Sequence, residues 1–443
     1  MHLALWAAKR DGPAGGHRIP GGLFMLRYHG PSRRSVLAGA AAFAVSGTLP
    51  RFALAQPAGG PVRLRAASVE RIELGGSKPL ELFQNLLPGP VLRVKRGAPL
   101  SAVVDNALKA PLSVVFPGVR ATAAAAGIEG LTGEALNPTG SREISFAPPD
   151  AGSFLYRAFA PEQMTRGLVG ALIVEETDPS PFAADQALVI QSFSPDPTMK
   201  VPLLTVNGAV SPTIEAPAGG RVRVRLLNAS PHFLRTHVVA ASPCYVLAVD
   251  GQPTEPFVMK DGRAQITPGG RLDITVDMGT ANPVVLEVET SQLPVQLAIL
   301  VPVGPGTATG PQTTAPAPAA LPSNGLPANI PLDNAARYQM SLGGTPNLSA
   351  LTSLGTVAKD GTVVVALENP HDVPVAVQLF GMPARLLDGV DDGWKPWWHD
   401  AIAVPPKATV RAALVASLPG KWPILAQRAG DGALVAARYY EVK

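Results

Sequence analysis

The residues of this chain that could bind a metal through nitrogen or sulfur are few. Beyond residue 55, the 443-residue chain contains four histidines and one cysteine: His232, His237, His371, His399 and Cys244. Imidazole and thiolate are common ligands of copper and zinc, but several of them must converge on one ion. His232 and His237 lie five residues apart on one predicted strand, so their side chains point to opposite faces. We therefore expect surface or loop histidines and no Cys/His metal cluster.

Other residue types offer little more for catalysis. Asp388, Asp391 and Asp392 form paired carboxylates in "DGVDDGW", but a Gly-containing polar loop favours a solvated turn over an acid–base pair. The chain has no Gly-x-Ser-x-Gly elbow and no phosphate-binding loop. Cys244 lies in the apolar run "CYVLAVDG", which predicts a small buried side chain and no internal disulfide.

The first 55 residues have the pattern of an export signal. Arg33 and Arg34 precede the short, mildly apolar run "SVLAGAAAFAV", and Arg51 and "ALA" follow, which predicts cleavage after Ala55. This pattern is typical of a twin-arginine signal, so we expect the twin-arginine translocase as a partner during export and a periplasmic protein. The alternative is a basic patch before a buried helix. Translation could start at Met1 or at Met25.

The net charge of the chain changes when the leader is set apart. Residues 1–55 hold seven of the 37 Lys and Arg residues and one of the 33 Asp and Glu residues, so the remainder carries a net charge of −2. The basic character therefore belongs to the leader, and we expect no nucleic-acid partner. No run of about 18 apolar residues occurs outside the leader.

The rest of the chain contains one unit three times. Residues 93–114, 215–238 and 356–377 each have a Gly turn, an alternating apolar strand, an Asn, a short polar loop and a further strand. Alternation with a period of two predicts strands with one buried face, as in β-sandwiches. The predicted organisation is a leader at 1–55, domains at 58–178, 179–303 and 332–443, and a Pro/Ala/Thr-rich linker at 304–331.

Four further stretches resemble the multicopper oxidases. They are "LLPGPVLRVKRG", "GSFLYRAFAPEQMTRGLVGALIVEE", "LLTVNGAVSPTIEAPAGGRVRVRLLNAS" and "HDAIAVPPKATVRAALVASLPGKW". The resemblance implies an all-β fold of three consecutive cupredoxin-like Greek-key sandwiches. In that family, copper lies in the third domain and between the first and third domains. The mononuclear site uses a thiolate and imidazoles, and the trinuclear cluster uses imidazoles.

The four copper motifs of this family can be aligned on the chain by their framework residues. These are Pro111, Gly118 and Arg120; Gly152, Phe154 and Tyr156; Gly381; and Pro419, Gly420 and Trp422. The ligand positions between them hold Val115 and Pro117, then Arg157 and Phe159, then Val375, Gln378 and Phe380, and finally Leu425, Ala426 and Gln427. The alignment predicts that the assignable copper ligands have been replaced, and we expect no cofactor.

This pattern resembles the SufI/FtsP cell-division type, a degenerate, copper-free branch of the superfamily. The resemblance implies a non-enzymatic scaffold or binding protein with protein partners in the periplasm or cell envelope, acting in cell division or stress protection. One alternative is an oxidoreductase that binds copper through other ligands. Another is a small-molecule binder that uses the former cluster cavity between domains 1 and 3.

A tryptophan-rich stretch is a candidate contact for a partner protein. "DDGWKPWWHD" carries three of the five tryptophans, and Trp residues are enriched in binding hot spots. Trp398 belongs to a Trp-x-Asp pattern with Asp400 that resembles a structural stretch of the oxidases, so we expect it in a core. Trp394 and Trp397 are the candidate surface residues.

Overall fold

The computed structural model divides into the units Met1–Arg51 and Phe52–Lys443. It describes residues 60–121, 128, 130–196, 198–199, 201–290, 293–304, 316–387 and 394–443. The predicted signal residues Arg33, Arg34 and Ala55 and the carboxylates Asp388, Asp391 and Asp392 lie outside the described residues. Within the described part, no helix is long and apolar enough to cross a membrane.

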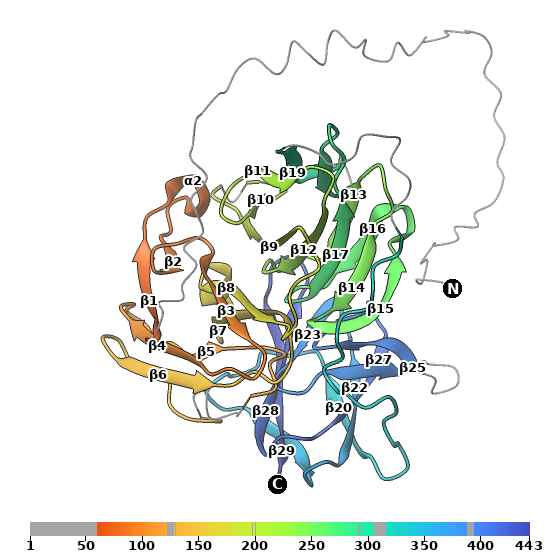
Figure 1. Ribbon diagram of the computed structural model, residues 1–443. Helices are drawn as coiled ribbons and strands as arrows, with labels where there is room; N and C mark the ends of the chain where they lie inside the picture. The colour runs from red at the N-terminus through yellow and green to blue at the C-terminus, as the bar shows by residue number, and fades with distance from the viewer. Residues whose placement is uncertain are drawn as a thin grey trace, which may run out of the picture. The chain divides into compact units, whose positions relative to one another are not determined.

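The strands of the described chain form six sheets, which follow one another in pairs along the sequence (Figure 1). The first sandwich pairs the sheets β2-β1-β4-β6 and β3-β8-β7-β5. Its strands are β1 (Val62–Val69), β2 (Leu80–Phe83), β3 (Gly89–Lys95), β4 (Leu100–Asn106), β5 (Val114–Val115), β6 (Ser141–Phe146), β7 (Gly152–Ala158) and β8 (Val169–Glu175). Two short helices, α2 (Ile72–Gly75) and α3 (Pro161–Thr165), accompany it.

The second sandwich contains a six-stranded sheet, β10-β9-β12-β17-β14-β15, and a five-stranded sheet, β11-β19-β18-β13-β16. The strands are β9 (Ala184–Phe193), β10 (Leu203–Val206), β11 (Thr213–Pro217), β12 (Arg221–Asn228), β13 (Leu234–Val239), β14 (Tyr245–Val249), β15 (Gln252–Val258), β16 (Arg263–Ile266), β17 (Arg271–Asp277), β18 (Val284–Val288) and β19 (Val295–Val303). A 3₁₀ turn, η2 (Lys260–Gly262), precedes β16.

The third sandwich has two five-stranded sheets, β20-β22-β27-β24-β25 and β21-β29-β28-β23-β26. The strands are β20 (Ala336–Ser341), β21 (Thr352–Val357), β22 (Thr362–Glu368), β23 (Val375–Leu379), β24 (Ala384–Leu387), β25 (Trp394–His399), β26 (Ala401–Val404), β27 (Thr409–Val415), β28 (Gly420–Arg428) and β29 (Leu434–Val442). The all-β fold class predicted from the sequence is confirmed. The domain boundaries stay predictions.

The same strand pairing recurs in all three sandwiches. In one sheet of each, the opening strand runs parallel to a later one: β1 beside β4, β9 beside β12, and β20 beside β22. In the other sheet the parallel pairs are β3 with β8, β11 with β19, and β21 with β29. The repeat in the sequence therefore corresponds to a repeated topology.

The recurring asparagine closes the same turn in each repeat. The Nδ2 of Asn106, Asn228 and Asn369 donates to the carbonyl oxygen four residues later, at 2.9, 2.8 and 2.9 Å. The Oδ1 accepts the backbone N–H two residues later, at 3.0, 3.0 and 2.9 Å. All three side chains are buried, and an unpaired buried amide is costly, so the geometry favours Asn at each position.

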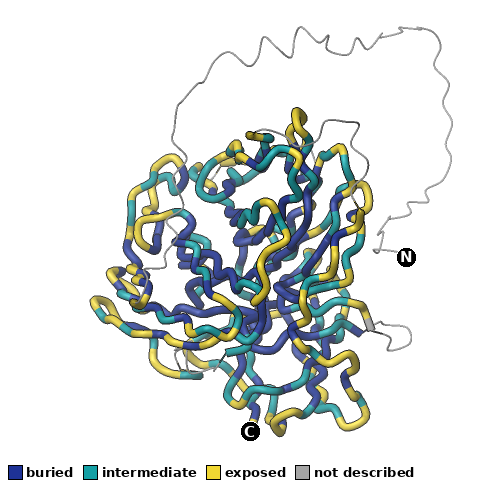
Figure 2. The backbone as a smooth tube through the Cα atoms, viewed as in Figure 1, coloured by how far each residue is buried: buried dark blue, intermediate teal, exposed yellow. Residues whose placement is uncertain are grey.

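One strand of the first sandwich is buried on both faces. Phe154 and Tyr156 of β7 point into the core between the two sheets, whereas Leu155 lies in a cluster with Val189 and Leu227 of the second sandwich. All seven residues of β7 are buried. Figure 2 shows the buried stretches of tube gathered where the sandwiches meet as well as within each one. This strand carries the second of the aligned motifs.

The predicted linker packs against the sandwiches where it is described. Asn324 is buried, and its Nδ2 donates to the carbonyl oxygen of Ala151 at 2.9 Å and to Oε1 of Gln252 at 3.0 Å. Arg96 and Arg120 donate to the carbonyl oxygens of Ser323 and Asn324. This part of the segment therefore binds both the first and second sandwiches.

Candidate functional site

The four aligned motifs lie on two pairs of neighbouring strands. Val115 of β5 is paired with Arg157 of β7, which brings the first and second motifs together. Gln378 of β23 is paired with Leu425 of β28, which does the same for the third and fourth motifs. The two strand pairs belong to the first and third sandwiches and approach each other at the aligned positions.

Six of the ten aligned positions share one buried hydrophobic cluster: Val115, Phe159, Val375, Phe380, Leu425 and Ala426. The rings of Phe159 and Phe380 meet edge to face, with centroids 5.9 Å apart and planes inclined by 67°. Aromatic pairs of this geometry contribute about 0.5–1.5 kcal/mol beyond the burial of their area. Apolar packing therefore joins the first and third sandwiches at this place.

Arg157 extends from β7 beside this cluster. Its Nη1 donates to the carbonyl oxygens of Ala158 and Phe159, at 2.8 and 3.4 Å, and its guanidinium carbon lies 5.7 Å from the centre of the Phe380 ring. The side chain is fully buried, and this burial lowers the pKa of Arg157 to about 10. The guanidinium therefore remains charged at neutral pH.

Gln378 turns away from the cluster towards a buried ion pair. Its Nε2 donates to the carbonyl oxygen and to Oδ1 of Asp400, at 3.1 and 3.0 Å. Asp400 follows β25 in the third sandwich and accepts two hydrogen bonds from Arg271 of the second, one of them Nη2 to Oδ2 at 2.6 Å. Arg271 Nε also donates to the carbonyl oxygen of Ser153 in the first sandwich, at 3.0 Å. One guanidinium thus joins all three sandwiches.

The turn at Pro117 and Gly118, within the first motif, contacts this ion pair directly. Gly118 has a φ of 76°, and a Cβ built there would overlap the carboxylate of Asp400 and lie 2.9 Å from Nη2 of Arg271. A residue other than glycine would therefore meet both a left-handed backbone and a steric clash. The Pro117–Gly118 step is accordingly part of the junction, and Pro117 is buried there.

Two further groups determine the electrostatics of the junction. The Oδ2 of Asp250 lies 3.1 Å from Nδ1 of His399, and its Oδ1 accepts the backbone N–H of Arg271. Burial raises the pKa of Asp250, but the His399 hydrogen bond and the charge of Arg271 outweigh it and hold the pKa below its usual range. For Asp400 burial prevails over Arg271 and raises the pKa to about 6.

A second buried ion cluster lies between the first and second sandwiches. Arg225 binds both oxygens of Asp185 at 2.6 Å, and Arg223 Nη2 donates to Oδ2 of Asp273 at 2.6 Å. Ser153 Oγ donates to Oδ1 of Asp273 at 2.7 Å. The residue pattern of the sequence did not identify either cluster, because the arginines and their carboxylate partners are 40 to 129 residues apart in the sequence.

The remaining candidate residues lie apart from these clusters. Gln427 is half-buried, and its Nε2 donates to the carbonyl oxygen of Gly432. His371 contacts the carbonyl oxygen of Leu342, and His237 lies 3.4 Å from Glu287. His399, bound to Asp250, differs from the expected surface or loop histidine. Trp398 packs in a small core cluster with Ile330 and Leu387, in agreement with the expectation.

The side chains at the ten aligned positions do not fit copper. None is an imidazole, a thiolate or a thioether, and the amide of Gln378 is bound to Asp400. Among the described residues, no group of three or more His, Cys, Asp or Glu side chains is arranged to hold a metal ion. We therefore assign no chemical step to a metal at these positions.

The candidate partner residue Trp397 lies at a contact between sandwiches. Its ring is stacked on that of Phe257, with centroids 4.8 Å apart and an interplanar angle of 14°. The backbone of Trp394 pairs with Leu387, and its side chain lies outside the described residues. Trp397 is half-buried, so one face of the indole is engaged within the molecule.

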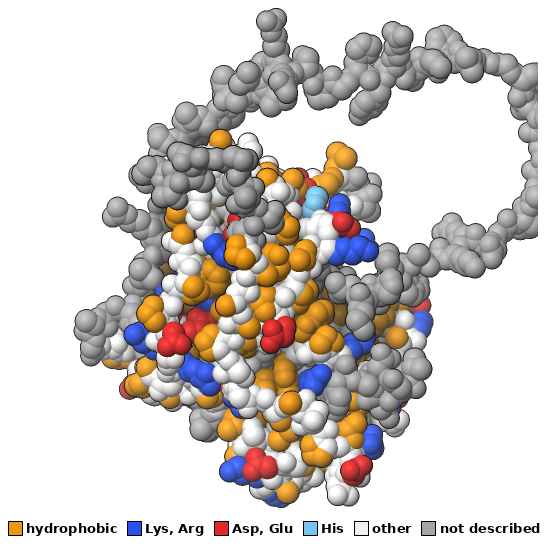
Figure 3. All heavy atoms as spheres, turned by 45° about the vertical axis from the view of Figure 1, so that its right-hand side comes forward, with side chains coloured by type: hydrophobic (Ala, Val, Ile, Leu, Met, Phe, Trp, Pro, Cys, Tyr) orange, Lys and Arg blue, Asp and Glu red, His pale blue; other side chains and the backbone are white. Residues whose placement is uncertain are grey.

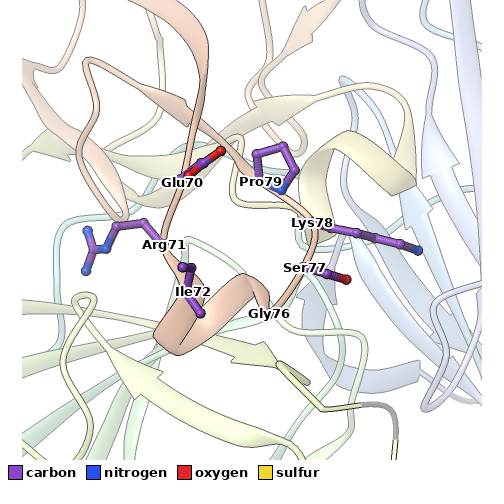
Figure 4. A pocket seen from close by; sticks show the side chains of 7 residues that line it. All are labelled: Glu70, Arg71, Ile72, Gly76, Ser77, Lys78 and Pro79. Carbon is purple, nitrogen blue, oxygen red and sulfur yellow. The ribbon is translucent and has the colours of Figure 1, made fainter.

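Two of the surface cavities in the described part of the chain lie away from these clusters. A cavity of about 480 Å³ is lined by residues 70–72 and 76–79, but Figure 4 shows the charged ends of Arg71 and Lys78 pointing away from each other. A cavity of about 200 Å³ lies between β15, residues 320–326 and Trp398, and near it the Thr254 hydroxyl is buried without a partner.

On the face in Figure 3, the coloured Lys and Arg side chains are scattered among Asp and Glu.

Comparisons with known proteins agree with this architecture. The family model described as multicopper oxidase matches residues 67–179. The multi-copper oxidase from Pseudomonas thermotolerans has a TM-score of 0.74 and 25% identity, and the match covers 87% of this chain and 99% of that one.

Three curated proteins show how far the sequence similarity extends. Cell division protein FtsP from Yersinia pestis is 30% identical over 225 residues, 44% of this chain and 46% of FtsP. Multicopper oxidase MmcO from Mycobacterium tuberculosis is 24% identical over 421 residues, 80% of this chain and 81% of MmcO. Copper resistance protein A from Escherichia coli is 29% identical over 116 residues, 26% of this chain.

The matches differ in how much of each relative they cover. The chain spans 19% of the length of copper resistance protein A and just under half of FtsP. The structural match, in contrast, includes nearly the whole oxidase. Together, the family match, the repeated sandwich topology and the structural similarity show that residues 67–179 match the multicopper oxidase family and that the chain resembles the multicopper oxidase superfamily, including its FtsP type.

Proposed function

We propose that this protein is a copper-free, non-enzymatic member of the superfamily that acts as a scaffold or binding protein in the bacterial cell envelope, in cell division or its protection under stress. Export through the twin-arginine translocase and a periplasmic location are parts of the same proposal. They rest on Arg33, Arg34 and the cleavage pattern ending at Ala55.

One observation carries the proposal. The positions that the motif alignment assigns to copper ligands include Val115, Phe159, Val375, Phe380, Leu425 and Ala426, which pack together between the first and third sandwiches. Such packing stabilises the contact by burying apolar area, whereas unliganded imidazoles there would be costly to desolvate. The similarity to FtsP supports the cell-division part of the proposal.

Copper content tests the absence of a metal cofactor. We expect the mature protein, residues 56–443, purified after copper-replete expression and export, to hold well below one copper per chain and to lack a blue absorption band. Elemental analysis and a visible spectrum measure both. Several coppers per chain would contradict the motif alignment and restore the oxidoreductase alternative.

Deletion of the gene tests the role in the envelope. We expect cells without the protein to divide poorly under envelope stress, and the wild-type protein to restore division. A variant with Arg33→Lys and Arg34→Lys keeps the charge of the leader but lacks the paired arginines, so it should fail to restore division. Normal division of the deletion strain under stress, or full rescue by the variant without export, would contradict the proposal.

A further inference from the structure

Four arginines stand out among the fully buried side chains: Arg157, Arg223, Arg225 and Arg271. Three of them bind carboxylates. Arg223 contacts Glu176 and Asp273, Arg225 contacts Asp185 and Asp273, and Arg271 contacts Asp400. Arg157 is the exception, because within the described part of the chain it forms no ion pair.

The neighbours of Arg157 do not balance its charge. Its hydrogen bonds go from Nη1 to two backbone carbonyls, and its other recorded contact is the Phe380 ring. Burial alone accounts for its lowered pKa, without a contribution from any acidic group. A lone buried charge is strongly unfavourable, and two carbonyl dipoles and an aromatic ring at 5.7 Å compensate for only part of that cost.

The guanidinium group also has N–H groups that donate no hydrogen bond within the described part of the chain. They are those of Nε and Nη2, which have no hydrogen-bond acceptor among the described residues. A guanidinium edge with two adjacent N–H groups matches a carboxylate in bidentate geometry and also binds halides.

We propose that Arg157 anchors a binding site for a small anion, a halide or a carboxylate, between the first and third sandwiches. The anion supplies the negative charge that Arg223, Arg225 and Arg271 receive from side chains of the protein. The Phe380 ring borders the site, and the full burial of the Arg157 side chain restricts the site to small anions. The site is independent of the proposed function and survives if that function is wrong.

Thermal unfolding of the mature protein tests this site. Sodium bromide and sodium formate are titrated separately at constant ionic strength, starting from a buffer with a bulky organic anion. We expect a saturable rise in Tm for the wild type, because a ligand that binds the folded state stabilises it. The rise should be lost in Arg157→Gln. In Arg157→Lys the apparent affinity for the anion should fall by roughly tenfold, because lysine keeps the charge but lacks the paired N–H donors of the guanidinium group. Arg93→Gln, which removes a partly exposed arginine paired with Glu175, should keep the full response.

A second measurement on the wild type covers the case in which Arg157→Gln does not fold. Chloride NMR should show line broadening that saturates and that bromide displaces, which would assign the site to halides. Displacement by formate as well would extend the site to carboxylates. A linear, unsaturable response, or a saturable one that persists in Arg157→Gln, would overturn the proposal.

Discussion

Arg271 and Asp400 are 129 residues apart in the sequence, yet Nη2 of the arginine lies 2.6 Å from Oδ2 of the aspartate, and both side chains are 1% exposed. The pair joins the second sandwich to the third, and the same guanidinium reaches the backbone of the first at Ser153. Loss of the Arg271–Asp400 pair should therefore weaken the packing of all three sandwiches against one another.

Asp400→Asn should lower the stability of the protein by about 3–5 kcal/mol, because it leaves the buried Arg271 without its carboxylate. The shift of the urea unfolding midpoint measures this effect. Asp431→Asn is the matched control, since Asp431 pairs with Arg428 at the surface and its loss should cost less than about 1 kcal/mol. Equal effects of the two substitutions would show that the buried pair does not stabilise the assembly.

Gly118→Ala should be far more destabilising than Gly97→Ala. The two glycines have nearly the same φ, 76° and 75°, so the left-handed backbone costs about 1–2 kcal/mol in both cases. A Cβ at Gly97 meets nothing within 4 Å, whereas one at Gly118 overlaps the Asp400 carboxylate. The difference between the two unfolding midpoints measures the clash alone, and similar midpoints would mean that the turn can move away from Asp400.

The contribution of Asp400 to stability should decrease as the pH rises. Its pKa in the folded protein is about 6, above the ordinary value of 3.8. Below pH 3.8 the carboxyl group is protonated in both the folded and the unfolded protein, and Asp400 makes its full contribution to stability. That contribution is lost as the pH rises through about 6. Asp250, whose pKa is lowered, changes its contribution only below 3.8 and in the opposite direction.

Unfolding midpoints measured between pH 4 and pH 7.5 test this dependence. The wild type minus Asp400→Asn difference removes the contribution of ionisable groups that do not interact with Asp400, because they are present in both proteins. We expect the wild type to lose stability relative to Asp400→Asn as the pH rises. If the difference between the two midpoints does not change with pH, or if the wild type gains stability relative to the variant, Arg271 keeps Asp400 ionised throughout this pH range.

Phe159→Ala and Phe380→Ala should each lower stability by about 3–5 kcal/mol, since both rings are buried. The double substitution should cost less than their sum by about 0.5–1.5 kcal/mol, because the edge-to-face contact can be lost only once. A double-mutant cycle of unfolding midpoints measures this coupling. Additive effects would show that the first and third sandwiches are not linked through these rings.

The parts of the fold that could be predicted are those encoded locally. Alternation along residues 100–106 predicts a strand with one buried face, and the burial pattern of β4 has that period. The spacing of Asn106, Asn228 and Asn369 revealed the repeat because each side chain bonds within four residues of itself. Local hydrogen bonds leave a recurring pattern in the sequence.

Contacts between sandwiches could not be predicted in the same way. Trp397 stacks on Phe257 and Arg271 binds Asp400, yet no spacing rule links residues on different sandwiches. The motif alignment predicts a replaced ligand at position 157, but an arginine in a sequence gives no sign that it is fully buried without a carboxylate. That property depends on which charged residues of other strands reach it.

The turn that each recurring asparagine closes has a consequence for how the repeats can diverge. In all three, the amide spans a fixed four-residue separation, from 106 to 110, 228 to 232 and 369 to 373. In the first and third repeats the amide bonds across the loop only to backbone atoms, so side chains there can change without breaking these bonds. In the second repeat the Ser230 hydroxyl also donates to Asn228 Oδ1, at 2.7 Å. An insertion or deletion in any of these loops would instead break the hydrogen bonds across the loop and leave each buried amide only its bonds to more distant carbonyl oxygens. Evolution should therefore vary the composition of these loops while conserving their length.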